Sequence, residues 1–128
     1  MANEEVKQKI KKFTDLVVWQ QARGLAKQTY NVAMVLPPEE RYGLASQMKR
    51  AAVSVASNIA EGFKRDTMKD KIRFYVQAHG SLTELQNQII IGNDVGLIED
   101  DMKNGLLQFT DRVDALLTGL IRASKERL

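Results

Sequence analysis

The side chains that could carry out chemistry are few in this 128-residue sequence. Cysteine is absent, which excludes disulfides, thiolate metal sites and a cysteine nucleophile. The only histidine, His79, has no histidine four residues away and no Glu-x-x-His partner, so the spacing of a helical metal site is missing. Asp66 and Asp70 could hold a magnesium ion, but Asp70 also fits a helix cap with Thr67. The sequence therefore predicts a protein that is not an enzyme and has neither metal nor cofactor.

Basic side chains form the other candidate site, because they gather in two short segments. Residues 61–73 contain five basic residues against three acidic ones, and residues 1–12 contain four lysines against two glutamates. Residues 94–114 contain six acidic residues and only two basic ones. Affinity for phosphate rises with the number of contacts. We expect phosphate contacts from Lys64, Arg65, Lys69, Lys71 and Arg73, with Lys7, Lys9, Lys11 and Lys12 as a supplementary arm; the alternative is a merely solvated loop and helix start.

Four segments position these residues, each with the apolar spacing of three and four that is typical of an amphipathic helix. The Pro-Pro pair at 37–38 separates the first two, and Gly62 is expected just after the second helix. Thr67 and Asp70 form a capping pair for the third, and the acidic run at 99–101 begins the fourth. The expected buried stripes are Leu16, Trp19, Arg23, Ala26, Tyr30 and Ala33; Leu44, Met48, Ala51, Ala52, Val55 and Ile59; Ile72, Tyr75, Val76, His79, Leu82, Leu85 and Ile89; and Met102, Leu106, Phe109, Val113, Leu116 and Leu120.

Four such helices with short connections predict an all-α fold, an antiparallel up-down four-helix bundle. We place the bundle at residues 13–128 and a basic N-terminal arm or helix lead-in at residues 1–12. No stretch approaches the roughly 20 apolar residues needed to cross a bilayer. The first residues also lack the apolar segment of a secretion signal. We therefore expect a single domain in the cytoplasm.

A second stripe on the second helix is polar but has mostly short side chains. Ordinary solvated surfaces favour Lys and Glu, so the stripe suggests a polar seam packed against another helix or another subunit; the alternative is a plain solvated face. An arginine in such a seam needs a carboxylate, and Glu84 is the candidate partner for Arg50. The residues expected at the seam or oligomer contact are Gln47, Arg50, Ser54, Ser57, Asn58, Glu61, His79 and Glu84.

Three stretches carry a family resemblance that spans about residues 13–120. They are Phe13-x-x-Leu16-x-x-Trp19-Gln20-x-Ala22, Tyr42-Gly43-Leu44-x-x-Gln47-x-x-Arg50-Ala51-x-x-Ser54-x-x-x-Asn58-Ile59-Ala60-Glu61-Gly62 and Phe74-Tyr75-x-x-Ala78-x-Gly80-Ser81-x-x-Glu84-Leu85. Together they resemble the bacterial four-helix-bundle proteins encoded in intervening sequences of large-subunit (23S) rRNA genes. Those proteins are related to the accessory variability determinants of diversity-generating retroelements. The resemblance implies a homopentameric barrel, and the retroelement relatives use a positively charged surface to bind nucleic acid and a reverse transcriptase.

Two functional hypotheses follow. The first is a non-enzymatic homo-oligomer that binds structured RNA or an RNA–DNA hybrid through its basic surface, without reading sequence. The second is an interaction scaffold that docks a partner, such as a reverse transcriptase, without touching nucleic acid. The polar seam and Trp19 would then be the anchors, although Trp19 on an apolar stripe also fits a core position. A nuclease is disfavoured, because no carboxylate pair is clustered beside the basic residues.

Overall fold

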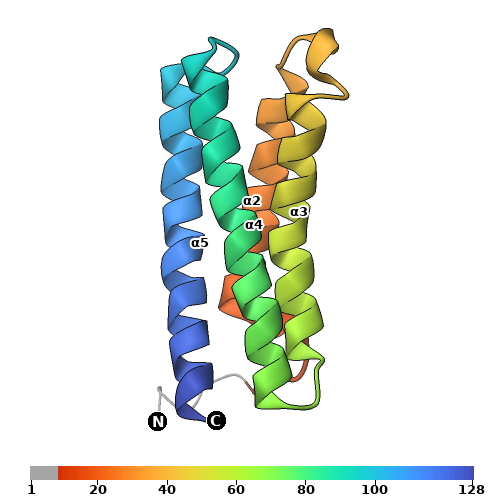
Figure 1. Ribbon diagram of the computed structural model, residues 1–128, viewed down its shortest axis with the longest axis vertical. Coiled ribbons are helices and arrows are strands. Elements are labelled where there is room, and N and C mark those ends of the chain that lie inside the picture. The colour runs from red at the N-terminus through yellow and green to blue at the C-terminus, as the bar shows by residue number, and fades with distance from the viewer. Residues whose placement is uncertain (1–8) are drawn as a thin grey trace.

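Four long helices make up almost all of the computed structural model, which describes residues 9–128. They lie side by side and alternate in direction, as Figure 1 shows. Two single turns of 3-10 helix precede the first and second long helices. The elements are η1 (Phe13–Asp15), α2 (Val17–Met34), η2 (Pro38–Glu40), α3 (Leu44–Phe63), α4 (Met68–Asp94) and α5 (Asp100–Glu126).

The order of packing around the bundle follows the order of the chain. Each long helix packs against the next one in sequence, and α5 packs back against α2, so the four helices form a closed square. Short connections allow only antiparallel neighbours in such an arrangement. The predicted all-α, up-down four-helix bundle is confirmed. None of the helices in the described part of the chain is long and apolar enough to span a membrane.

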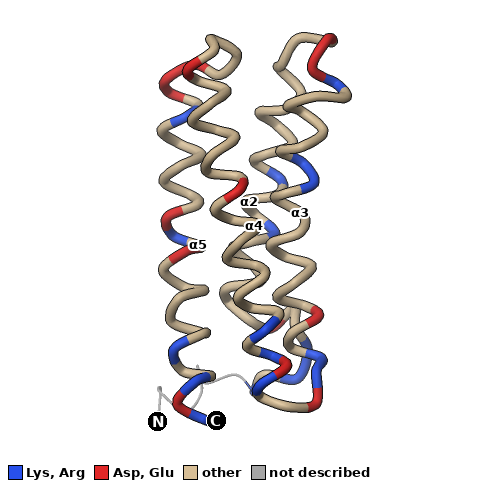
Figure 2. The backbone as a smooth tube through the Cα atoms, viewed as in Figure 1, with Lys and Arg blue, Asp and Glu red and all other residues tan. Residues whose placement is uncertain are grey.

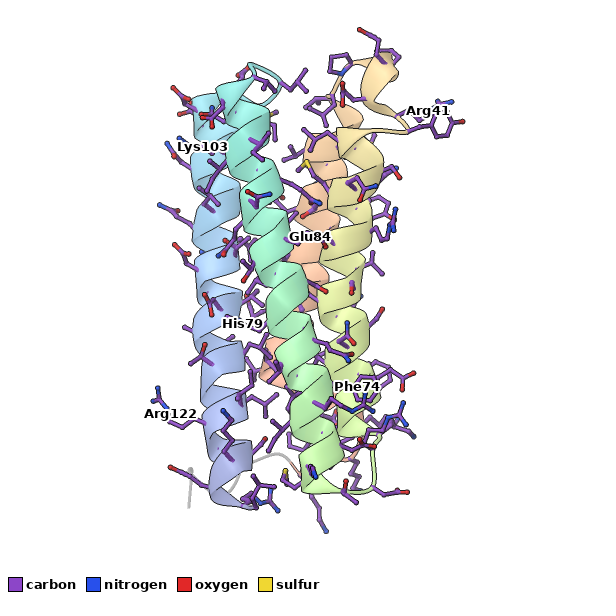
Figure 3. All side chains as sticks on the ribbon, viewed as in Figure 1. Arg41, Phe74, His79, Glu84, Lys103 and Arg122 are labelled. Atoms are coloured by element: carbon purple, nitrogen blue, oxygen red, sulfur yellow. The ribbon has the colours of Figure 1, made fainter. Side chains whose placement is uncertain are left out.

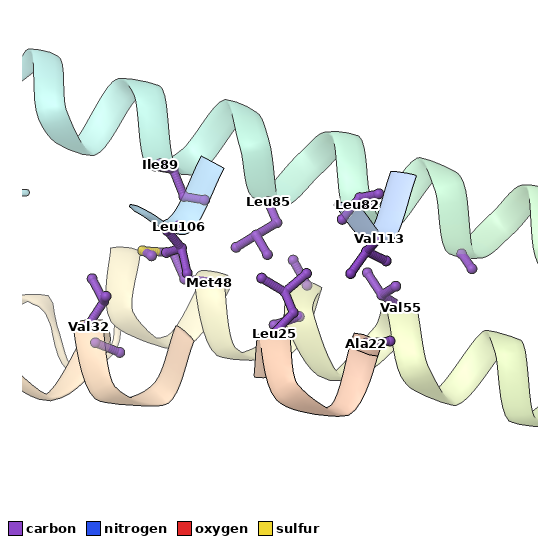
Figure 4. Close-up of a cluster of buried hydrophobic side chains, with 14 of the residues drawn as sticks. Ala22, Leu25, Val32, Met48, Val55, Leu82, Leu85, Ile89, Leu106 and Val113 are labelled. Carbon is purple, nitrogen blue, oxygen red and sulfur yellow. The ribbon is translucent and has the colours of Figure 1, made fainter. Parts of the chain in front are cut away.

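The core lies between the four helices and is filled mainly by aliphatic side chains. Figure 4 shows Leu25 and Met48 meeting Leu85, Ile89 and Leu106 in its centre. These five side chains are at most 1% exposed. Burying one large aliphatic side chain contributes about 1.5–3 kcal/mol, so this layer supplies much of the driving force for folding. The core is continuous along the bundle and fixes how the helices lie relative to one another.

The predicted stripe of α2 was wrong by one position around the helix. The buried residues are Val18, Ala22, Leu25, Thr29, Val32 and Ala33. Of the predicted stripe, Trp19 is half-buried, whereas Arg23 and Tyr30 are exposed and face the side of α3. One residue along a helix turns the side chain by about 100°, so two stripes of similar spacing lie side by side. Smaller residues such as Ala22 and Val18 are buried in the core, whereas the bulkier Trp19 and Tyr30 lie at its edge.

The other three stripes were closer to the observed core. The stripe of α3 is confirmed, with Leu44 half-buried at its start. In α4 the predicted Val76 is 50% exposed and Ala78 is buried in its place. In α5 Leu116 is 38% exposed, and Leu117 enters the core instead. Each error again shifts the stripe by one or two residues.

The predicted starts of the third and fourth helices are confirmed, whereas Pro38–Glu40, expected as the first turn of the second helix, forms a separate 3-10 turn before α3 begins at Leu44, and the role of Gly62 was wrong. The Thr67 Oγ1 atom accepts a hydrogen bond from the Asp70 backbone N–H at 3.1 Å, and two acids occupy the first turn of α5. Gly62, however, lies inside α3 and is buried. A Cβ atom there would lie 2.7 Å from Cε1 of Tyr75 and 3.0 Å from Cβ of Phe74. The glycine is therefore needed for the close approach of α3 and α4.

We expect Gly62→Ala to destabilise the protein by about 1–3 kcal/mol, because overpacking at this contact forces the helices apart. A glycine-to-alanine change inside a helix ordinarily has the opposite sign. Gly119→Ala is the matched control, since nothing lies within 4 Å of its Cβ position in α5. It should be neutral or stabilise by up to about 1 kcal/mol. Urea unfolding of both variants measures the difference, and equal effects would contradict the assigned role of Gly62.

Candidate nucleic-acid interface

The antiparallel topology brings three separate segments to one end of the bundle. The start of α2, the α3–α4 turn and the end of α5 meet there, as Figure 1 shows. Within residues 9–16, 61–73 and 120–128 there are eleven basic and five acidic residues. We call this region the basic end. Residues 37–43 and 92–104 lie at the other end and contain six acidic and two basic residues. Figure 2 shows this separation of charge along the long axis.

The sequence analysis missed the contribution of α5 to the basic end. Arg122, Lys125 and Arg127 lie in and beyond the last turns of this helix. Arg122 is labelled in Figure 3 near the same end as Phe74. The first half of α5 is acidic, and for this reason the sequence analysis treated the whole helix as acidic and missed its basic last turns. The predicted antiparallel order would have placed this turn beside residues 61–73.

Lys64 and Lys69 have the fewest contacts of the five basic residues predicted around the α3–α4 turn. Both side chains are exposed. Among residues 9–128, neither side chain takes part in an ion pair, a hydrogen bond or a contact with an aromatic ring. A free ammonium group can turn its three N–H donors towards a phosphate without first breaking another contact. These two lysines are therefore the best placed for phosphate contacts.

Arg65 and Arg73 are held in place by the ring of Phe74. Their guanidinium carbons lie 4.3 Å and 4.7 Å from its centroid. Arg65 also pairs with Glu61 at 3.4 Å, and Arg73 pairs with Asp70 at 3.2 Å. Exposed pairs of this kind contribute little to stability and are readily exchanged for another anion. The ring therefore positions two guanidinium groups that can still reach a phosphate.

Lys71 has a structural role instead. Its Nζ donates a hydrogen bond to the backbone carbonyl of Phe63 at 2.5 Å, and it lies 5.3 Å from the centroid of the Phe63 ring. The acceptor is the last residue of α3, where helix carbonyls lack partners within the helix. A cation there also suits the negative end of the helix dipole. Lys71 thus caps α3 from the first turn of α4, and its ammonium group is engaged by Phe63 rather than available for a phosphate.

The described part of the predicted N-terminal arm, residues 9–12, lies beside the same end, where Ile10 borders a hollow with Lys71 and Arg127. Lys9, Lys11 and Lys12 are exposed, whereas Lys7 lies outside the described residues. The backbone N–H groups of Lys11 and Lys12 each donate to Oδ2 of Asp15 at 3.0 Å. These hydrogen bonds lower the pKa of Asp15 below its usual 3.8. The ionised Asp15 therefore fixes the backbone that carries two of the arm's lysines.

The predicted polar seam is divided between different contacts. Ser54 Oγ lies 2.8 Å from Ser81 Oγ of α4, and Asn58 Nδ2 donates to Ser54 Oγ at 3.1 Å. These residues form a true polar contact between α3 and α4. The remaining seam residues of α3, Gln47, Arg50, Ser57 and Glu61, are exposed.

Two of the expected seam partners lie elsewhere. The predicted Arg50–Glu84 ion pair is absent within the chain, and both side chains are exposed. His79 faces α5 rather than α3, and its Nε2 lies 2.8 Å from Oδ1 of Asp114. The predicted seam residues therefore do not all lie at one contact. Among residues 9–128, no group of three or more acidic or histidine side chains could hold a metal ion.

The chain belongs to a family of four-helix proteins. Residues 14–119 match the family described as 23S rRNA-intervening sequence protein, so the chain is a member of that family. The fold is also similar to a crystal structure of a protein of unknown function from the S23 ribosomal protein family of Bacteroides thetaiotaomicron VPI-5482. The two chains are 18% identical, with a TM-score of 0.77, over 82% of this chain and 98% of the other. Among curated proteins, none matches the chain in sequence.

We expect the Asp15 carboxyl to titrate below pH 3.8, because its ionised form accepts two backbone hydrogen bonds. The resulting stabilisation of the lead-in is fully present above pH 3.8 and is lost as the pH falls through the lowered pKa. NMR titration of the Asp15 carboxyl carbon, with the amide protons of Lys11 and Lys12 as reporters, measures this. A pKa at or above 3.8, or amide shifts that ignore the titration, would contradict the assigned contact.

Lys71 and Lys69 give a second test of the local structure, since they lie two residues apart and have different surroundings. Lys71→Met removes the hydrogen bond to the Phe63 carbonyl and should destabilise the protein by about 1–2 kcal/mol. Lys69→Met removes an exposed charge and should change stability by less than about 0.5 kcal/mol. Denaturant unfolding compares the two variants, and an unaffected Lys71→Met would remove the proposed cap.

Proposed function

We propose that the protein is a non-enzymatic, homo-oligomeric nucleic-acid-binding protein that holds the phosphates of RNA, or of an RNA–DNA hybrid, at its basic end. One observation carries the proposal. Three segments that are far apart in the sequence converge at one end and place eleven basic residues there against five acidic ones. A surface that gathers basic residues in this way suits a polyanion better than a small anion, because the charges are spread over several helices.

The chemistry of the basic end favours the nucleic-acid backbone over the bases. Lys64 and Lys69 carry flexible ammonium groups, and Arg65 and Arg73 are held on Phe74. Such contacts fix position on a nucleic acid but read no sequence. A tyrosine hydroxyl is neutral near pH 7, and burial raises the pKa of Tyr75 nearby still further, so this residue adds no negative charge. Binding should therefore depend strongly on salt and weakly on sequence.

Self-association would strengthen this binding. The family resemblance implies a homopentamer, and a symmetric assembly repeats the basic end once for each copy. Each additional phosphate contact adds to affinity and to its dependence on salt.

The alternative function, a scaffold that docks a protein partner, would use Trp19. This residue is half-buried at the edge of a hollow between α2 and α3, where Arg23 lies 5.7 Å from its ring centroid.

The central prediction concerns a double charge reversal at the basic end. Lys64→Glu with Lys69→Glu should weaken binding to labelled RNA hairpins and RNA–DNA hybrids by at least about tenfold at moderate salt. The slope of log affinity against log salt should fall by roughly 0.7–0.9 for each lost contact. Fluorescence polarisation at several salt concentrations measures both quantities, and the loss should be uniform across sequences.

A matched control changes the net charge equally at the opposite end. Arg41→Glu with Lys103→Glu reverses two charges near the acidic loops, where Figure 3 labels both residues. This variant should lose at most a small part of the affinity, because only the summed field of the protein changes. Equal losses in both variants would show binding without a defined site. An oligomer that binds no nucleic acid even at low salt would contradict the proposal and favour the scaffold.

A further inference from the structure

A hollow lies at the basic end, and all three segments of that end border it. Its volume is about 350 Å³, which is within the range of small-ligand sites. Ile10 comes from the lead-in, Met68 from the start of α4 and Arg127 from the end of α5. Figure 1 shows these parts of the chain at the same end of the bundle. The hollow therefore lies where the core reaches this end, beside the residues assigned to phosphate contacts.

The walls of the hollow are mostly apolar, and a cation stands at its edge. Phe63, Met68 and Leu120 supply apolar wall, and Ile10 adds to it although its side chain is 47% exposed. Arg127 is exposed and borders the hollow directly after α5 ends. Small-ligand sites typically combine apolar walls with a few polar groups that fix orientation. This hollow suits a ligand with an apolar body and a negative charge beside it.

Two buried hydroxyl groups border the hollow and have unused hydrogen-bonding capacity. Tyr75 is 3% exposed, and among residues 9–128 its hydroxyl makes no hydrogen bond. Burial alone raises its pKa, without a contribution from a hydrogen bond. Buried tyrosine hydroxyls usually have a partner. Ser124 is 5% exposed, and its Oγ donates to the Leu120 carbonyl at 2.7 Å, so that oxygen can still accept a hydrogen bond. The hollow thus offers a donor and an acceptor to the polar edge of a ligand.

We propose that the hollow holds the base of an unpaired nucleotide, in an RNA whose phosphates lie on the basic end. This inference rests on the proposed function and names the feature of RNA that the same site recognises. An unpaired base has apolar faces and a polar edge, and a phosphate is attached through its sugar. The apolar walls, the Tyr75 hydroxyl and Arg127 match these three parts. A paired base is held inside the stack of its helix and does not enter.

The lysines assigned to phosphate contacts lie next to the hollow in the sequence. Phe63 precedes Lys64, and Met68 precedes Lys69. An RNA backbone held by both lysines therefore passes beside the hollow, and an unpaired nucleotide reaches it without a separate anchor. A free mononucleotide lacks the neighbouring phosphates, which favours RNA as the source of the base. Apolar walls accept any base, so binding follows the structure of the RNA and not its sequence.

Three RNA hairpins of otherwise identical sequence test the site. One has a fully paired stem, one has a single bulged uridine, and one has an abasic nucleotide at the bulge. In fluorescence polarisation the uridine hairpin should bind about tenfold more tightly than the abasic hairpin, because the two differ only in the base. An excess of free uridine monophosphate should leave this difference intact. If the free nucleotide abolishes it, the hollow is a site for small nucleotides and the inference about RNA is wrong.

Two substitutions locate the effect in the hollow. Tyr75→Phe removes only the unpartnered oxygen and should reduce the gain from the bulged uridine by about three- to tenfold. Ser124→Leu fills the hollow and should abolish the gain. Both variants should bind the fully paired hairpin as the wild-type protein does. Tyr42→Phe is the matched control, since Tyr42 lies at the other end of the bundle and is 87% exposed. Circular dichroism checks folding, and Tyr75→Phe decides if Ser124→Leu does not fold.

The outcome is separable from that of the proposed function. Equal affinities for the uridine and abasic hairpins, or a gain that survives Tyr75→Phe undiminished, would overturn the inference. A protein that binds the fully paired hairpin with a steep salt dependence, but gains nothing from the bulged uridine, refutes the base site alone. A protein that binds none of the three hairpins even at low salt refutes the proposed function and the base site together.

Discussion

The close approach of α3 and α4 is the constraint on which the rest of the structure depends. Gly62 lets the Tyr75 ring lie against the backbone of α3, and small buried residues such as Ala51 and Ala52 allow neighbouring helices to pack closely against α3. The Ser54–Ser81 hydrogen bond and the one from Lys71 to the Phe63 carbonyl fix the height of α4 against α3. The same contact determines the short turn between the helices, where Lys64 and Lys69 are exposed and Lys71 caps α3. Packing at this interface thus sets the geometry of the candidate site.

Charge is separated along the bundle, and this separation follows from the antiparallel order of the helices. Net charge is only +3, which by itself indicates little about partners. Folding collects the basic residues of three segments at one end, and it places the acidic loops at the other end.

Sequence periodicity predicted the fold and most of the core, but not the exact face of every helix. The apolar stripe of α3 was correct because most of its other residues are polar or small, whereas α2 has two stripes that are almost equally apolar. The bulk of Trp19 and Tyr30 favoured the wrong stripe, and the core accommodated Ala22 and Leu25 instead. Helix ends were predicted well where a side chain caps them, as at Thr67. Gly62 was misassigned, because close approach to another helix leaves no signal in a single sequence.

The candidate site was predicted in part for similar reasons. Clusters such as 61–73 are visible in the sequence, but the contribution of Arg122, Lys125 and Arg127 depends on the direction of α5. Composition also could not distinguish Lys71 from Lys69, since only the fold gives Lys71 a carbonyl partner. The proposed ion pair of Arg50 with Glu84 was a reasonable match of charges. The structure leaves both side chains exposed and forms no ion pair between them.

Lysine footprinting tests the central claim most directly. The protein is acetylated briefly with and without a saturating RNA hairpin, and the modified lysines are quantified by mass spectrometry. The account predicts strong protection of Lys64, Lys69 and Lys125 at the basic end, and no protection of Lys103 at the other end of α5. Protection of Lys103 equal to that of Lys64, or no protection at the basic end under conditions where RNA is bound, would contradict it.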